Sequence, residues 1–300
     1  GLTNTVDSFL VNQLGMESPP RVLLSGVLVG GMISLMLGGE ALMLRAFAIL
    51  VYPLVAILFF LSIYLIPSWQ MPDVSVPEFS GFMKTLWLSI PIIVFSFSHA
   101  AAISSFVYVQ RAHYGNNAKM KSEAILKRTS LLLIVFVLLF VFSCVLSLST
   151  EQMIQAKADN VSILSFLANI TDNSFIATLG PLVAFIAITS SFLGHFLGAR
   201  ESFNGLVSKQ AHMNPKLVDK IGTVIMFFAI WYCSVINPSI LDMMDQLSGP
   251  IIAMILFIMP MIAVYKVPSL HKYRNRLSTL FVLTVGSLAV FALIYSMIIK

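Results

Sequence analysis

Charged residues are scarce in this chain. Of its 300 residues, 10% are charged and 58% are hydrophobic, and the mean hydropathy is +0.92. Soluble domains carry roughly 25% charged residues, so the composition excludes an ordinary soluble domain. The apolar blocks have the length of membrane-crossing helices and lack the alternation over about 10 residues that a membrane β-barrel strand shows. The sequence therefore predicts an all-α polytopic membrane protein embedded in a lipid bilayer.

Cysteine and recognisable catalytic motifs are also scarce or absent. Cys144 and Cys233 both fall in apolar segments, which favours core thiols over a disulfide or a metal site. None of the 13 acidic residues lies near the middle of an apolar block, so we do not expect a carboxylate proton relay. No nucleophile–base pair, metal-spaced cluster or nucleotide loop can be assembled. We therefore expect neither an enzyme nor a cofactor. The net charge of +5 is spread over short loops, so nucleic acid is not an expected partner.

Eight apolar segments are long enough to cross a bilayer. They are residues 22–37, 42–66, 84–109, 129–148, 174–203, 217–236, 246–264 and 277–299. The connection 150–173 is acidic and rich in amides, and we expect a short surface helix there. If the loops alternate sides, most of the 18 lysines and arginines lie on one side, which the positive-inside rule assigns to the cytoplasm. Both ends of the chain are then expected outside.

The start of the chain has no signal-peptide features. Residues 1–7 contain no initiator methionine, basic region or cleavage pattern. We expect the chain to begin partway through a protein, with residues 1–15 at the end of a helix.

The third segment has a polar centre. Ser96, Ser98 and His99 cluster around Phe97, next to Ala100 and two further alanines. Polar side chains are costly in hydrocarbon unless they face protein or a water-lined cavity. A discontinuous helix around a binding site would use such residues. Alternatively, the hydroxyls bond back to their own helix carbonyls and His99 fills a packed core.

The fifth segment carries consecutive hydroxyls at Thr189, Ser190 and Ser191. Consecutive residues point around a helix, so at least one faces the bundle. Hard oxygen ligands are what a sodium site needs, although Ser and Thr also bond membrane helices together. His195 lies four residues after Ser191, on the same face, and is either a candidate proton carrier or a structural histidine. At the end of this segment, Arg200 and Glu201 are expected to pair or to anchor in lipid headgroups.

These stretches resemble the hydroxy and aromatic amino acid permease family, most closely its serine transporter branch. The resemblance runs in order through essentially all 300 residues. It rests on Phe95-Ser-Phe-Ser-His99, Ile103-Ser-Ser-Phe106, Ser191-Phe-Leu-Gly-His195, Leu197-Gly-Ala-Arg-Glu201, Asn237-Pro-Ser-Ile-Leu241 and the run from Gly249 to Phe257.

The resemblance implies a partial leucine-transporter-type fold, built from inverted five-helix repeats, with one helix broken near residues 96–101. Residues 1–300 would form a single transporter domain that lacks about the first three helices of the family fold. The substrate site would use Ser96, Phe97, Ser98, His99 and Ala100. Thr189 and Ser190 or Ser191 would lie where sodium is coordinated in relatives with this fold.

Two positions depart from the serine branch. Ser98-His-Ala-Ala101 stands where the branch usually has Asn-His-Ser-Pro, so a break here must arise without proline. Thr189-Ser-Ser191 stands where the branch commonly has Thr-Lys-Ser, and losing the lysine leaves room for a sodium ion.

The resemblance implies a monomeric symporter of the bacterial inner membrane. It would import serine, threonine or a similar small polar amino acid, coupled to H+ or Na+, by alternating access. The alternative is a membrane protein that binds or senses an amino acid without moving it.

Overall fold

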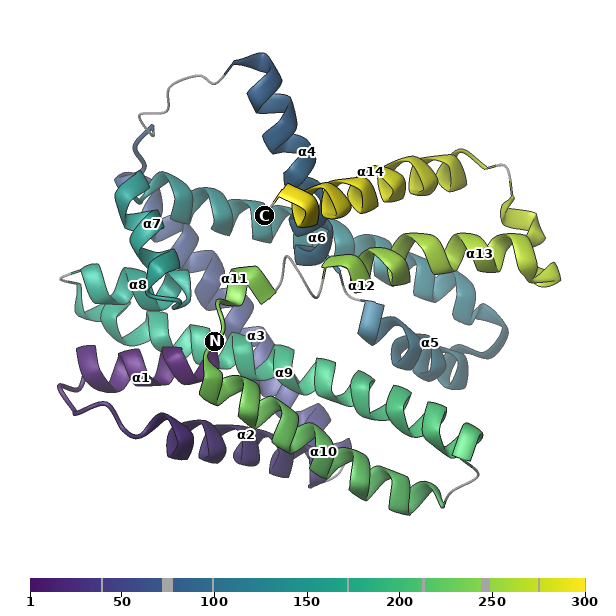
Figure 1. Cartoon of the computed structure of the whole chain (residues 1–300), viewed down its shortest axis with the longest axis horizontal. Helices are drawn as coiled ribbons and strands as arrows, with labels where there is room; N and C mark the ends of the chain where they lie inside the picture. The colour runs from purple at the N-terminus through teal and green to yellow at the C-terminus, as the bar shows by residue number, and fades with distance from the viewer. Residues whose placement is uncertain are drawn as a thin grey trace. The chain divides into compact units, whose positions relative to one another are not determined.

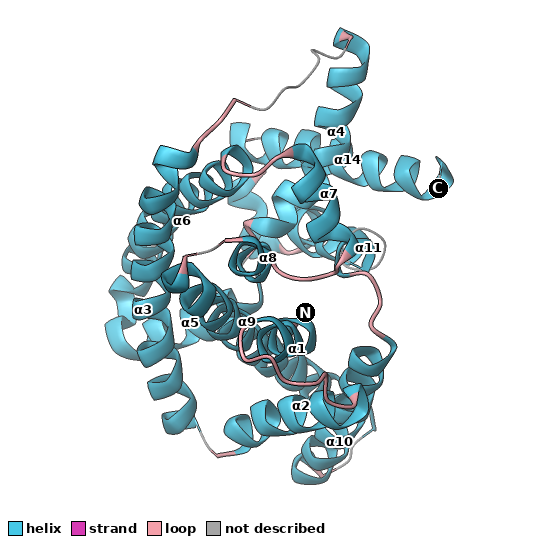
Figure 2. Cartoon of the chain, turned by 90° about the vertical axis from the view of Figure 1, so that its left-hand side faces the viewer, coloured by secondary structure: helices cyan, strands magenta, loops and turns pink. Residues whose placement is uncertain are grey.

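The computed structural model describes residues 1–38, 40–71, 78–98, 100–171, 173–211, 214–243, 249–274 and 276–299. Within these ranges the chain is helical, and no strand occurs (Figure 2). Six of the described helices are long and apolar enough to cross a membrane, and two shorter apolar helices, Arg21–Leu37 and Ile251–Lys266, account for the remaining predicted segments. The all-α polytopic class is therefore confirmed.

The chain divides into two compact units. The first comprises Gly1–Pro72 and Ser130–Pro238, and the second comprises Asp73–Thr129 and Ser239–Lys300. The first unit contains α1 (Leu2–Asn12), α2 (Arg21–Leu37), α3 (Glu40–Leu65), η1 (Ile66–Ser68), most of α6 (Ala118–Leu146), α7 (Thr150–Ala158), α8 (Ile163–Ile170), α9 (Ser174–Ala211) and α10 (Pro215–Ile236). The second contains α4 (Phe79–Ser96), α5 (Ala100–Tyr114), η2 (Gly115–Asn117), the start of α6, α11 (Ile240–Met243), α12 (Gly249–Ala253), the π-helical segment η4 (Met254–Ile258), α13 (Met259–Lys266), η5 (Pro268–Tyr273) and α14 (Leu277–Ile299).

The long helix α9 organises the first unit. Its early residues, including Val183 and Ala184, pack into an apolar core with α3, α6, α7 and α8. Leu193 and Phe196, further along, pack into a second core with α1 and α2, against which α10 also rests. Figures 1 and 2 both show α1, α2, α9 and α10 lying side by side. Helix α9 therefore contributes to both apolar cores of the first unit.

The connection from α6 to α9 contains the predicted short surface helix, because Ala156 is the only buried residue of α7. It also forms a second helix that was not predicted: α8 buries five consecutive residues, including Phe166 with 1% of its surface exposed. The Ser162 side chain caps this helix by accepting from the Ser165 N–H. Gly180 of α9 permits the close crossing, because a Cβ there would lie 2.7 Å from the Leu164 carbonyl oxygen. The apolar run Ile163–Ile170 therefore belongs to the core.

A network of hydrogen bonds joins four segments of the first unit. The Asn4 amide donates to the Asn160 carbonyl oxygen at 2.7 Å and to Asn237 Oδ1 at 3.0 Å, and Arg21 Nη2 donates to Asn4 Oδ1 at 2.7 Å. Asn160 and Asn237 both adopt left-handed backbone, with φ of 53° and 55°. Asparagine tolerates this conformation better than most residues. Asn237 is also the C-cap of α10, which ends at Ile236 as predicted.

In the second unit, α4 and α14 pack together. Trp87 Nε1 donates to the Leu288 carbonyl oxygen at 2.9 Å, and the Trp87 and Tyr295 rings lie 5.2 Å apart. η4 meets α14 even more closely, since a Cβ on Gly286 would lie 2.5 Å from Phe257 Cβ. Helix α14 spans Leu277–Ile299, the predicted residues.

The two cysteines behave differently. Cys144 is buried in the first core, as predicted. Cys233 lies on the exposed face of α10, so its assignment to a core was wrong. Both thiols are free.

Candidate functional site

The predicted third crossing is interrupted where its polar centre lies. Helix α4 ends at Ser96, and α5 begins at Ala100. Phe97 leaves helical geometry, with φ −97° and ψ 2°, and its N–H donates to the Ile93 carbonyl oxygen at 3.2 Å. The Ser98 N–H then donates to the Phe95 carbonyl oxygen at 3.0 Å, which tightens the last turn. The predicted break near residues 96–101 is therefore confirmed, and it forms without proline.

The side chains at this break differ in their surroundings. Ser96 is exposed, and its hydroxyl donates to the Ile92 carbonyl oxygen at 2.9 Å, so this hydroxyl bonds back to its own helix. Phe97 and Ser98 are half-buried. His99 and the side chain of Ala100 lie outside the described residues, so their predicted roles stay predictions.

A break of this kind exposes backbone groups that can bind a ligand. The Ile93 and Phe95 carbonyl oxygens at the end of α4 each accept one N–H and keep a second lone pair, and the first N–H groups of α5 have no partners within their own helix. The partial positive charge at a helix N-terminus favours a carboxylate, and the partial negative charge at a helix C-terminus favours an ammonium group. The first turn of α5 contains no acidic residue that would compete for its N–H groups. The geometry therefore suits a zwitterionic ligand.

The three consecutive hydroxyls of α9 point in different directions, as predicted. Thr189 has 5% of its surface exposed, Ser190 is half-buried and Ser191 is exposed. Ser190 donates to the Ala187 carbonyl oxygen at 3.0 Å. Thr189 Oγ1 has no hydrogen-bond partner within the described part of the chain. Leaving a buried hydroxyl without a hydrogen-bond partner costs about 1–3 kcal/mol of stability. Thr189 Oγ1 has a free lone pair, and a ligand bound there would recover part of this cost.

His195 shares a face with Ser191. Its Nδ1 lies 2.8 Å from the Ser191 carbonyl oxygen and 3.5 Å from Ser191 Oγ. A carbonyl oxygen can only accept, so Nδ1 carries the hydrogen, and Nε2 of the neutral ring is left as an acceptor. The ring is exposed in this structure. Thr189 therefore faces the core, whereas His195 faces away from it.

The two stretches belong to different units. The α4–α5 break lies in the second unit, whereas Thr189, Ser191 and His195 lie in the first. That they form one site stays a prediction.

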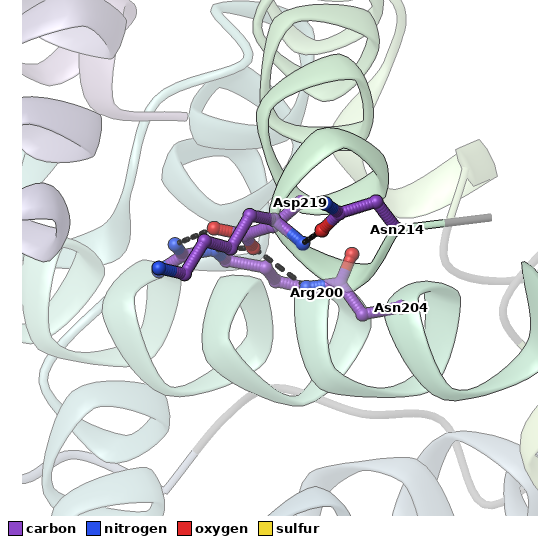
Figure 3. Close-up of polar contacts among 5 residues, drawn as sticks. Arg200, Asn204, Asn214 and Asp219 are labelled. Carbon is purple, nitrogen blue, oxygen red and sulfur yellow. Dashed lines mark hydrogen bonds and ion pairs between the residues drawn. The ribbon is translucent and has the colours of Figure 1, made fainter. Parts of the chain in front are cut away.

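The sequence did not predict a polar clamp between α9 and α10 (Figure 3). Arg200 Nε donates to Asp219 Oδ1 at 2.7 Å, and Arg200 Nη2 donates to Oδ2 at 2.5 Å. The Asn204 amide donates to Asp219 Oδ1 at 2.6 Å. Bidentate pairing of this kind fixes geometry as well as adding energy. The sequence analysis did not predict Asp219 as the carboxylate partner of Arg200, and contact with lipid headgroups stays a prediction.

The clamp sets the rotation of α9. Arg200 follows Thr189 by 11 residues, or about three turns at 3.6 residues a turn, so both lie on the strip that also carries Phe196. Holding Arg200 against α10 therefore holds Thr189 toward the core and His195 away from it. Asp219 is the only acidic residue of α10. This was the one sequence feature from which the Arg200–Asp219 pair could have been predicted.

Comparisons with known proteins agree with the resemblance found in the sequence. The model of the tryptophan/tyrosine permease family matches residues 6–300. The chain is 44% identical to the serine transporter SdaC of Escherichia coli (strain K12) over 99% of this chain and 72% of that protein, with the same values for SdaC of Shigella flexneri. It is 35% identical to the threonine/serine transporter TdcC of Escherichia fergusonii over 98% of this chain and 73% of that protein. No solved structure matches. The chain belongs to the tryptophan/tyrosine permease family.

Proposed function

We propose that this protein imports a small polar amino acid, serine or threonine, as a cation-coupled symporter. The observation that carries the proposal is the 44% identity, over 99% of this chain, to a protein named as a serine transporter. A second relative is named as a threonine/serine transporter. Membership of a permease family also agrees with the expectation that the chain is not an enzyme.

The substrate binds at the α4–α5 break. Its carboxylate accepts from the first N–H groups of α5, and its ammonium group donates to the last carbonyls of α4. The hydroxyl of Ser98 and the imidazole of His99 bond to the substrate hydroxyl, and Phe97 closes the apolar side. Broken helices near the bilayer midplane bind substrates in this way in secondary transporters.

The coupling cation binds at the hydroxyls of α9. Thr189 Oγ1 is buried and unpaired within the described residues, so it is the α9 hydroxyl best suited to coordinate the cation, whereas Ser190 bonds to its own helix and Ser191 is exposed. Oxygen ligands suit Na+, whereas Nε2 of His195 suits a proton. Separate gradients of the two ions decide between them.

Orientation follows from the basic loops. The connections from α5 to α6, α9 to α10 and α13 to α14, together with the helix ends beside them, hold most of the lysines and arginines. They therefore face the cytoplasm of a bacterial inner membrane, and the C-terminus lies outside. A C-terminal phosphatase fusion is then active and a C-terminal green fluorescent fusion dark. The reverse pattern contradicts this orientation.

Competition uptake in proteoliposomes tests the substrate site. Unlabelled serine and threonine should compete with labelled serine, while leucine and tryptophan should not. Ser98→Ala should raise the KM for serine. Ser89→Ala is the matched control on α4, because the Ser89 hydroxyl bonds only to the Thr85 carbonyl oxygen one turn earlier, and its KM should not change. Equal KM values for the two variants would place the substrate elsewhere.

A further inference from the structure

An apolar groove lies between the last two membrane helices of the second unit. Its volume is about 440 Å³, within the range of roughly 300–1,000 Å³ that small-molecule sites occupy. One wall is formed by η4 and α13 and the other by α14, which run side by side and are joined through η5 (Figure 1). Apart from Lys266, Tyr265 and Ser287, every side chain in its lining is apolar.

The groove is crossed by a close helix contact and is basic at one end. The contact is between η4 and α14, because Gly286 lets Phe257 approach its backbone. At the basic end α13 finishes at Lys266, which lines the groove and is exposed. Lys272 and Arg276 are exposed in the adjacent turn. The groove therefore leads from hydrocarbon depth to a cluster of positive charge.

Arg274 holds this mouth in shape. Its guanidinium donates to the carbonyl oxygens of Val264, at 3.3 Å, and of Tyr265, which are left unpaired by the end of α13. The same guanidinium lies 5.4 Å from the centre of the Tyr265 ring, which lines the groove. Lys266, by contrast, makes no ion pair with any residue that the structure describes.

The charge at the mouth lacks any neutralising partner nearby in the sequence. From Gly249 to Lys300 the chain contains no aspartate or glutamate. A second copy of the chain packed symmetrically on this groove would bring two basic turns together, which is unfavourable. A molecule with a hydrocarbon chain and an anionic head could pack against the apolar walls and neutralise the positive charge at the mouth.

We propose that this groove is a binding site for an anionic phospholipid. One acyl chain lies along the apolar walls, and the phosphodiester and its anionic headgroup meet Lys266 at the mouth. Basic pockets between membrane helices on the cytoplasmic side are suited to anionic headgroups. The acyl chain fixes the lipid at this position, and the Lys266 ammonium selects its charge.

Native mass spectrometry of the purified protein tests the site. The protein is equilibrated with equal amounts of phosphatidylglycerol and phosphatidylcholine that carry identical acyl chains. We expect one retained lipid, predominantly phosphatidylglycerol. Lys266→Gln should lower the phosphatidylglycerol preference about fivefold, since one lysine near a membrane surface contributes about that factor. Lys272→Gln is the matched control, because Lys272 lies in the adjacent turn, η5, and does not line the groove, and its preference should change less.

A second pair of variants tests the hydrocarbon part. Ser287→Phe fills the groove and should reduce retention of both lipids. Thr284→Phe adds the same bulk to α14 outside the groove lining and should leave retention intact. Equal losses in Lys266→Gln and Lys272→Gln would overturn the proposal, as would equal retention of the two lipids. Displacement of the lipid by inorganic phosphate alone would also overturn it and indicate a phosphate site, and a dimer formed through the groove would indicate a protein partner.

Discussion

Replacing Gly180 by alanine tests how α8 is seated on α9. An alanine Cβ at this position would lie 2.7 Å from the Leu164 carbonyl oxygen and 3.3 Å from Ala168 Cβ. The first contact is with backbone, so no side-chain rotation relieves it, and α8 must move as a unit. Because α8 buries Phe166 and four neighbours, its displacement loosens the first core.

The expected loss of stability in Gly180→Ala is estimated against a matched control. Gly205 lies on the same helix, and a Cβ there meets nothing within 4 Å. Alanine is favoured over glycine inside a helix by about 1 kcal/mol, and this gain applies to both variants and cancels in their comparison. The remaining difference is the overpacking cost, about 1–3 kcal/mol.

The assay is unfolding in mixed micelles of increasing dodecyl sulfate content, followed by circular dichroism. Gly205→Ala should be as stable as the parent or more stable. Gly180→Ala should be less stable than Gly205→Ala by the overpacking cost, about 1–3 kcal/mol. If both variants unfold at the same dodecyl sulfate fraction, the close contact between Gly180 of α9 and the Leu164 carbonyl oxygen of α8 is incorrect.

Three further predictions have defined outcomes. Arg200→Gln and Asp219→Asn, measured singly and together by the same unfolding assay, should show a coupling of about 1–2 kcal/mol, because the two side chains are only 21% and 30% exposed; additive effects would contradict the clamp. Asn237→Ala should be less stable than Asn237→Gly by about 1 kcal/mol, because φ is 55°, and equal stabilities would argue against left-handed backbone. Thr189→Val should leave stability unchanged or raised while reducing the apparent affinity for the coupling cation in uptake assays; a loss of stability with normal coupling would assign the hydroxyl to packing.

Much of the membrane topology could be predicted from the sequence. Segment length, hydropathy and helix-ending residues act locally, so α14 and the end of α10 at Ile236 match the expected limits. The break between α4 and α5 was also predicted, from the polar cluster around Phe97 and from the resemblance to a family with a broken helix at this position.

Long-range packing was less predictable. The run Ile163–Ile170 is too short to cross a membrane and lies in a polar connection, so nothing in the sequence indicates that α9 would cover it. Arg200 and Asp219 are 19 residues apart on different helices, and their pairing depends on how α9 and α10 are rotated. The π-helical segment Met254–Ile258 likewise leaves no sequence signal that we recognise.

Uptake of labelled serine by the purified protein in proteoliposomes, with an inward Na+ or H+ gradient imposed separately, tests the proposed function most directly. We predict that one of the two gradients drives serine above its external concentration and that collapsing this gradient releases it. Accumulation under neither gradient, by protein that still binds serine, would contradict symport.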